Sequence, residues 1–299
     1  MKILYFSNDH AWEVFGTTRS LATEVETRGH EVTFCDQARI KKIKKLAAKH
    51  DPDQIWLASS ALTLPKGVTL DEPVIGFGFS DPYYFTEDRL DSYDAYVTNH
   101  YETFEKYRDE LPCFYNQTAC DFRFHARMGL PREIDSSLIG LAGHPRFDDK
   151  NYRKTTVGRL RTDGFSVQAY GPGWPKHAMN HGPIAGESFL RVINQSKIGL
   201  DLQYPFSPLA HRMLEYGACG TPTITRDRPE VFRMLDRDSE VLTYTDYDDL
   251  KGKLKYYLEH PDELEAIGRN AEARCRRDHD VSRRVDALLP FVADIGKRR

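Results

Sequence analysis

The chain has 299 residues, of which 40% are hydrophobic and 29% charged, and its formal net charge is −3 at pH 7. This length favours two domains of similar size, and the composition is that of a globular protein. No apolar run approaches the roughly 20 residues that cross a bilayer, and the balanced charge gives no global footprint for nucleic acid or an anionic membrane. The five cysteines are scattered without a CxxC pair. We therefore expect reduced thiols, a cytoplasmic location and no membrane span.

The first half of the chain alternates short apolar strands with amphipathic helices. The opening MKILYFSNDH turns polar after a few apolar residues, which predicts a strand and not a signal peptide. Strands are predicted over 3–6, 31–34, 54–58, 73–79, 95–98 and 113–115, and helices over 17–28, 41–50 and 101–110. Such βαβ units imply a parallel sheet covered by helices.

A second cycle of the same kind begins near Ser137. Strands are predicted over 138–142, 165–170, 198–202 and 221–225, and helices over 152–161, 187–195 and 207–219. The stretch between Arg123 and Ser136 lacks clear periodicity, so we predict domains at 1–130 and 131–280. A C-terminal helix follows at 281–299, with a return to the N-terminal domain as one arrangement. Two doubly wound domains in tandem predict a binding cleft at the carboxyl ends of their strands.

The segment 207–230 carries the clearest chemical signal. Ser207 suits a helix N-cap and Pro208 the first helical position, while Gly220 and Pro222 end the helix. Ser207, His211 and Glu215 are spaced by four and share one helix face. Phosphates at the helix start and a ribose diol on the carboxylate would fit this face. The alternative is an N-capped helix with a surface Glu215 paired to Arg212.

The run HRMLEYGACGTPTITRDRPEV resembles the nucleotide-sugar signature of group 1 (family 4-like) GT-B glycosyltransferases, in detail the CgeB-like (spore maturation protein) branch. LIGLAGHPR resembles the strand and loop that open the second domain, and VQAYGPGW with NHGPI its next strand and base-binding loop. The resemblance implies an α/β GT-B fold, with two Rossmann-like domains facing a central cleft. The acceptor would bind the first domain and the nucleotide sugar the second.

The same resemblance implies a set of donor-binding residues. Glu215 matches the ribose-binding second Glu of the family's E-x7-E motif, whereas Ser207 stands where the first Glu would be. Arg212 and the loop from Gly143 to Arg146 are candidates for neutralising the diphosphate. The whole predicted set comprises Ser207, Leu209, His211, Arg212, Glu215, Gly143, Arg146, Tyr170, Gly171, His181 and Gly182.

Three residues of the first domain are candidates for the base that acts on the acceptor. Asp9 and His10 follow the first strand, and Asp81 follows a later one. Asp81 is preferred if the reaction inverts configuration, because inversion needs a base opposite the leaving group. A solvated loop histidine at His10 and an Asx-turn at Asp81 are the structural alternatives.

The leading function is transfer of a hexosyl or pentosyl group from a nucleotide-diphosphate sugar, such as a UDP-sugar, to a hydroxyl acceptor. A polysaccharide, a metabolite, a protein or a hydroxymethylated phage DNA base are all candidate acceptors, although the net charge gives no indication of DNA. The alternatives are a catalytically inactive binding module and a nucleotide-sugar epimerase. We expect neither a metal nor a cofactor, because the histidines lack metal-ligand spacing and Asp246 suits a helix N-cap.

Overall fold

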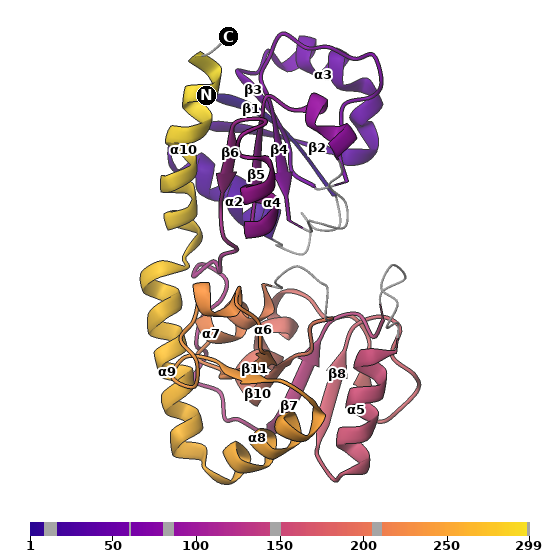
Figure 1. The fold of residues 1–299 in the computed structure, drawn as a ribbon, viewed down its shortest axis with the longest axis vertical. Helices are drawn as coiled ribbons and strands as arrows, with labels where there is room; N and C mark the ends of the chain where they lie inside the picture. Colours follow the sequence, from indigo (N-terminus) through magenta and orange to yellow (C-terminus); the bar gives the residue numbers. More distant parts are fainter. Residues whose placement is uncertain (9–16, 60, 80–86, 144–150, 205–210, 298–299) are drawn as a thin grey trace. The chain divides into compact units, whose positions relative to one another are not determined.

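The computed structural model describes residues 1–8, 17–59, 61–79, 87–143, 151–204 and 211–297. The chain divides into two compact units (Figure 1). Unit 1 comprises Met1–Ala119 together with Val281–Arg299, and unit 2 comprises Cys120–Asp280. Residues 120–130, which the sequence analysis placed in the first domain, are therefore part of unit 2.

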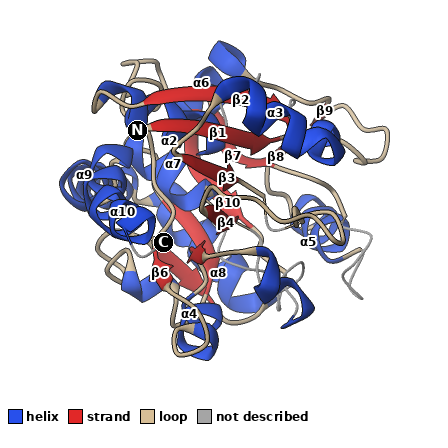
Figure 2. Cartoon of the chain, turned by 90° about the horizontal axis from the view of Figure 1, so that it is seen from above, coloured by secondary structure: helices blue, strands red, loops and turns tan. Residues whose placement is uncertain are grey.

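Within the described residues, unit 1 is built on a parallel six-stranded sheet of order β2-β1-β3-β4-β5-β6. Strands β1, β3 and β4 lie beside one another in Figure 2. The strands are β1 (Lys2–Ser7), β2 (Glu31–Asp36), β3 (Gln54–Leu57), β4 (Val74–Gly78), β5 (Ala95–Thr98) and β6 (Cys113–Tyr115). The helices are α2 (Thr17–Thr27), α3 (Ile43–His50), α4 (Tyr101–Tyr107) and α10 (Val281–Lys297), with 3-10 turns η1 (Gln37–Lys42) and η2 (Glu87–Ser92).

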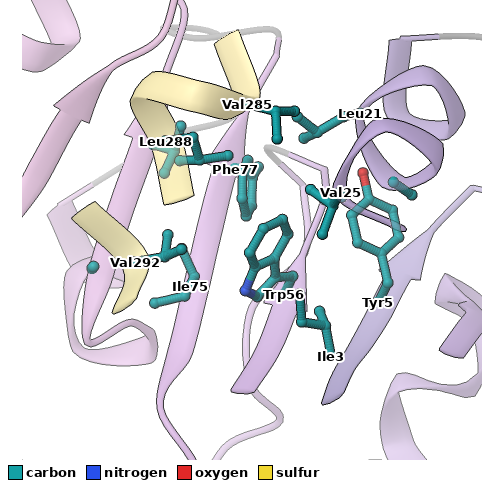
Figure 3. Packing of buried hydrophobic residues seen from close by; sticks show 14 of the residues in the cluster. Ile3, Tyr5, Leu21, Val25, Trp56, Ile75, Phe77, Val285, Leu288 and Val292 are labelled. Carbon is teal, nitrogen blue, oxygen red and sulfur yellow. The ribbon is translucent and has the colours of Figure 1, made fainter. Parts of the chain in front are cut away.

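Both faces of this sheet are covered, as the continuous apolar strands require. Ile3 and Tyr5 of β1 face α2 and α10, whereas Leu4 and Phe6 face α3. Figure 3 shows the first of these layers, where Trp56 packs against Phe77 with a ring separation of 5.0 Å. The buried Val285, Leu288 and Val292 of α10 complete the layer (Figure 3). The C-terminal helix is thus part of the core of unit 1.

Unit 2 contains a second parallel sheet, of order β12-β11-β10-β7-β8-β9 in the described part of the chain. Its strands are β7 (Ile134–Ile139), β8 (Val167–Tyr170), β9 (Asn180–His181), β10 (Ser196–Asp201), β11 (Thr223–Arg226) and β12 (Leu242–Tyr244). The helices are α5 (Tyr152–Thr162), α6 (Gly186–Gln195), α7 (Arg212–Ala218), α8 (Tyr247–Glu259) and α9 (Pro261–Asp278), with the 3-10 turn η3 (Val231–Arg233). The strand predicted over 138–142 was misplaced. β7 lies four residues earlier, because Ser136 and Ser137 interrupt its apolar pattern.

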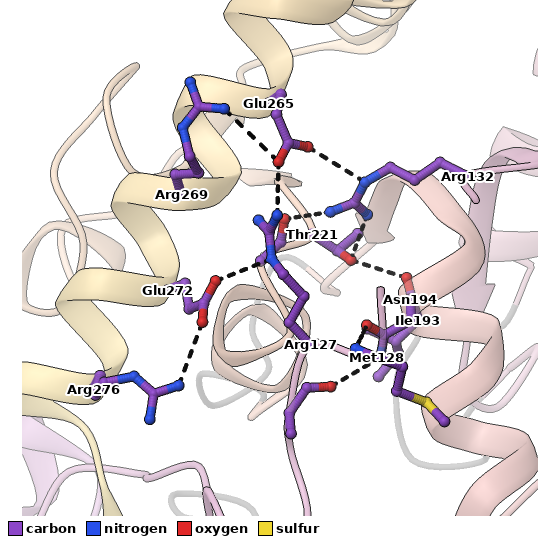
Figure 4. Close-up of polar contacts among 12 residues, drawn as sticks. Arg127, Met128, Arg132, Ile193, Asn194, Thr221, Glu265, Arg269, Glu272 and Arg276 are labelled. Carbon is purple, nitrogen blue, oxygen red and sulfur yellow. Dashed lines mark hydrogen bonds and ion pairs between the residues drawn. The ribbon is translucent and has the colours of Figure 1, made fainter. Parts of the chain in front are cut away.

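The segment before β7 is fixed to unit 2 by two arginines (Figure 4). Arg127 pairs with Glu265 at 2.9 Å, and Arg132 donates to the hydroxyl of Thr221 at 2.8 Å. The backbone NH of Cys120 also donates to the carbonyl of His279 at 2.9 Å. These contacts explain why a segment without helical or strand periodicity belongs to the second unit.

The strand order of unit 2 reverses between β7 and β10. The chain runs from β7 to β8 and β9 on one side, and from β10 to β11 and β12 on the other. In open sheets of this kind, ligands bind at the carboxyl ends of the strands at the point of reversal. The residues that follow Ile139 and Asp201 are therefore the first place to look for a site.

Candidate functional site

Helix α7 is held tightly against the strands on either side of the reversal point. Gly199 of β10 has no side chain, and a Cβ there would lie 2.5 Å from the ring of Tyr216. The hydroxyl of Tyr216 lies 2.8 Å from that of Ser137, which accepts a hydrogen bond from Ser196 at 2.7 Å. This buried chain of hydroxyls joins β7, β10 and α7. It fixes where the polar face of α7 lies.

The polar face of α7 carries an arginine–carboxylate pair. Glu215 is only 17% exposed, and its carboxylate accepts a hydrogen bond from Arg212. Arg212 also donates through Nε to the carbonyl of Ile139 at 3.1 Å and lies over the ring of Phe189 at 4.9 Å. Burial alone would raise the pKa of Glu215, but the electrostatic effect of Arg212, with smaller contributions from His125 and His211, brings it below its usual value. Glu215 is therefore an ionised carboxylate at the end of β7.

His125 faces the same carboxylate, although it is not among the residues predicted from the sequence. Its Nε2 lies 3.9 Å from Glu215, and the imidazole is 7% exposed. Its Nδ1 accepts a hydrogen bond from the backbone NH of Asp121 at 3.1 Å, so the neutral ring carries its proton on Nε2, toward Glu215. Burial lowers the pKa of His125 despite the opposing effect of Glu215. Residue 125 lies in the segment without periodicity, so no sequence pattern marked it.

His211 is the third polar group beside Glu215. Its Nδ1 atom is shielded from solvent and has no hydrogen-bond partner in the described part of the structure. Burial lowers the pKa of His211, although the charge of Glu215 acts in the opposite direction. A neutral imidazole with an unused ring nitrogen can donate to or accept from a bound ligand.

A second group of predicted residues lies at the ends of β8 and β9. The exposed ring of His181 stacks on the buried Tyr170, with centroids 4.6 Å apart and planes 18° from parallel. Gly171 has a φ of +127°, and a Cβ there would collide with the carbonyl oxygen of Gly140. Its NH bonds to the carbonyl of Gly182 at 3.1 Å. Four of the predicted donor-binding residues, Tyr170, Gly171, His181 and Gly182, therefore lie together at the carboxyl ends of β8 and β9.

Arg153 links the loops that follow β7 and β10. Its Nη1 donates to the carbonyl of Leu141 at 2.9 Å and its Nε to that of Leu202 at 2.7 Å. It forms no ion pair with any residue in the described ranges, and its guanidinium lies over the ring of Tyr204. The predicted Gly143 is at the end of the described part of the same β7–α5 loop. Arg153 was not among the predicted residues, because the periodicity of 152–161 predicts a helix but not what its side chains contact.

Solved structures with this architecture match almost the whole chain. Sucrose-phosphate synthase (tll1590) from Thermosynechococcus elongatus has a TM-score of 0.71 and 11% identity, over 100% of both chains. Anabaena Alr3699/HepE in complex with UDP and glucose has a TM-score of 0.69 and 10% identity, over 98% of this chain and 99% of that chain. AviGT4, a glycosyltransferase involved in Avilamycin A biosynthesis, has a TM-score of 0.69 and 12% identity, over 99% and 98%. The two units have the GT-B fold.

Comparison by sequence reaches a smaller part of the chain. A family model described as "Glycosyl transferase-like" matches residues 153–290, slightly under half of the chain. A comparison with curated proteins gives no match. The matched residues include α6, α7 and the strands β8 to β12, and so carry Glu215 and the stacked pair of the GT-B second unit.

Six predicted site residues lie outside the described residues. They are Asp9, His10, Asp81, Arg146, Ser207 and Leu209. The helix predicted from Ser207 is described from Arg212 onward, with His211 as its N-cap residue. The Arg212–Glu215 pair of the alternative interpretation is present, but Glu215 is largely buried and not a surface residue.

The described ranges contain no cluster of three or more histidine, cysteine, aspartate or glutamate side chains with the geometry of a metal site. The predicted N-cap at Asp246 is confirmed, since its carboxylate accepts from the NH of Asp249 at 2.9 Å. In the same ranges, no helix combines the length and apolar character needed to cross a membrane.

Proposed function

We propose that this protein is a glycosyltransferase that moves a sugar from a nucleoside-diphosphate sugar, most simply a UDP-sugar, to a hydroxyl acceptor. The observation that carries the proposal is the largely buried, ionised Glu215 at the β7–β10 reversal point, held by Arg212. A fixed carboxylate that accepts hydrogen bonds suits a ribose diol. The structural neighbour Alr3699/HepE, which was solved with UDP and glucose, supports the choice of nucleotide.

The proposed positions of the base and the diphosphate follow from the position of the ribose. The base would lie beside the stacked Tyr170 and His181, because aromatic faces bind planar rings. The diphosphate would lie near Arg153 and the loop of Gly143 and Arg146, because Arg153 forms no ion pair with a carboxylate of the described residues. His211, with its unused Nδ1, would bond to the ribose or a phosphate.

The reaction would proceed as a substitution at the anomeric carbon. The bond from that carbon to the diphosphate oxygen breaks, and the bonding pair leaves with the nucleoside diphosphate. The acceptor oxygen bonds to the carbon and gives its proton to a base, for which Asp81, His10 and Asp9 are the candidates. Cationic groups at the diphosphate stabilise the charge that develops there. The proposal needs no metal ion, and it leaves open which sugar, hexosyl or pentosyl, is transferred.

Finer assignments rest on sequence features alone. The resemblance of residues 211–231 supports placement in the CgeB-like branch. Five free cysteines, four of them buried, support a reducing, cytoplasmic location. The acceptor remains one of the hydroxyl-bearing classes named above, with DNA the least supported by the net charge of −3.

Calorimetric titration of UDP into Glu215→Gln tests the ribose assignment. We expect UDP affinity to fall by roughly tenfold or more, because a charge-assisted hydrogen bond is lost. Glu187→Gln, an exposed carboxylate on α6, is the matched control and should leave affinity unchanged. Unchanged UDP affinity in a folded Glu215→Gln protein would show that the ribose is bound elsewhere.

Incubation of the wild-type protein with UDP-, GDP- and TDP-sugars distinguishes a glycosyltransferase from an epimerase and from an inactive binding module. A glycosyltransferase releases the nucleoside diphosphate by slow hydrolysis of its donor, while an epimerase converts the sugar itself. An inactive binding module would bind the nucleotide and do neither.

A further inference from the structure

A cavity of about 200 Å³ lies in unit 2 at the carboxyl ends of β11 and β12. Its lining includes Tyr152, Arg159, Arg226, Tyr244 and Tyr247. The three tyrosines belong to, or pack against, the core layer under α5 and α8, whereas Tyr216 of α7 belongs to the layer on the other face of the sheet. The cavity therefore lies on the opposite face from Glu215. It is not part of the ribose and base surface.

Arg226 carries a polar atom that no described residue satisfies. It is the last residue of β11, and its Nη1 atom is shielded from solvent without a hydrogen-bond partner among the described residues. No carboxylate of the described residues pairs with it, and its contact with the ring of Tyr152 is at 5.4 Å. A shielded N–H of a guanidinium that lacks a hydrogen-bond partner is unfavourable, so a ligand that supplies an anionic acceptor would relieve the cost.

The other groups around the cavity favour the same ligand charge. The guanidinium carbon of Arg159 lies 3.5 Å from the ring centroid of Tyr247, and this contact holds a second cationic group at the cavity. The hydroxyls of Tyr152 and Tyr244 are 2.6 Å apart, so one donates to the other and the second keeps a hydrogen for a ligand oxygen. The acidic lining residue is Asp246, whose Oδ1 is bonded to the NH of Asp249, and Asp163 outside the lining accepts a hydrogen bond from the hydroxyl of Tyr247 at 2.9 Å.

We propose that this cavity binds a phosphate group carried by a small ligand, at a site separate from the nucleotide-sugar site. Two guanidinium groups match the charge of a phosphate dianion better than that of a single carboxylate. The space of about 200 Å³ accommodates a phosphate with a short organic part.

Calorimetric titration of inorganic phosphate into the wild-type protein, with and without saturating UDP, tests this site. We expect phosphate to bind in both conditions. Arg226→Gln should weaken phosphate binding by at least tenfold, and Arg226→Lys by less because it keeps the charge. Arg233→Gln, an exposed arginine of η3, makes the same charge change away from the cavity and should bind phosphate like the wild type.

Three results would overturn the proposal. Absence of phosphate binding to the wild type would exclude the site, and loss of phosphate binding when UDP is added would assign the phosphate to the donor site. Acetate binding as tightly as phosphate would assign a carboxylate instead. If Arg226→Gln does not fold, the titrations of Arg226→Lys and the wild type decide whether phosphate binds at Arg226. A protein that binds phosphate but no UDP would refute the proposed donor and leave this site standing.

Discussion

At the scale of single residues, the site depends on how one carboxylate is surrounded. The four-residue spacing of His211 and Glu215 suggests that they are neighbours, and the structure places both beside Arg212. The sequence alone is equally consistent with Glu215 and Arg212 forming an ion pair on the protein surface. Burial makes the difference, because a largely buried carboxylate with an arginine and two imidazoles beside it is the arrangement on which the proposed donor site rests.

The two buried imidazoles predict a loss of stability in acid. The folded-state pKa of both His125 and His211 lies below the usual 6.5, so the unfolded chain binds more protons as the pH falls. The contribution of these two imidazoles to stability is therefore complete above pH 6.5 and declines as the pH falls below it. For each pH unit in that range, the free energy of unfolding should fall by up to about 1 kcal/mol less in His125→Gln than in the wild type. Urea unfolding at a series of pH values measures this difference.

The control for this titration is His177→Gln, because His177 is exposed. It should show the same decline with falling pH as the wild type. An identical decline in His125→Gln would mean that His125 does not titrate below its usual range in the folded protein.

At the scale of elements, the placement of α7 depends on a glycine in the neighbouring strand. A Cβ on Gly199 would meet the ring of Tyr216, whose hydroxyl bonds to Ser137. Gly199→Ala should therefore push α7 away from β10 and reduce the free energy of unfolding by about 1–3 kcal/mol. UDP affinity should fall with it, because Glu215 moves with its helix. Urea unfolding and calorimetry measure the two effects.

Gly252→Ala in α8 is the matched control for Gly199→Ala, since no heavy atom lies within 4 Å of a Cβ added at Gly252. The better helix propensity of alanine should leave stability unchanged or raise it by up to about 1 kcal/mol. Equal effects of the two substitutions would contradict the close packing of α7 on β10.

At the scale of the whole molecule, the chain leaves unit 1 at Ala119 and returns to it at Val281. Leu288 of α10 and Leu254 of α8 are both fully buried, but they lie in the cores of different units. Each substitution to alanine should cost about 2–5 kcal/mol. Hydrogen exchange should show faster opening of α2 and β1 in Leu288→Ala, and of α5 and β10 in Leu254→Ala. Faster exchange throughout both units in either variant would show that they unfold as one.

The sequence by itself determined the local elements of this protein. Apolar runs and caps predict most strands and helices, because strand alternation, N-caps and glycine ends are set by residues close together in the chain. The resemblance around residues 211–231 indicated the GT-B fold, which the structural neighbours share.

Tertiary structure alone decided what surrounds Glu215 and Arg226. His125 lies in a segment without periodicity, and Arg153 lies in a helix whose long-range contacts no local pattern specifies, so only folding shows where they lie. The unpartnered Nη1 of Arg226 is likewise visible only once α5, β11 and β12 meet. Burial and the absence of a counter-charge are properties of all neighbours in space, and no local pattern along the chain records them.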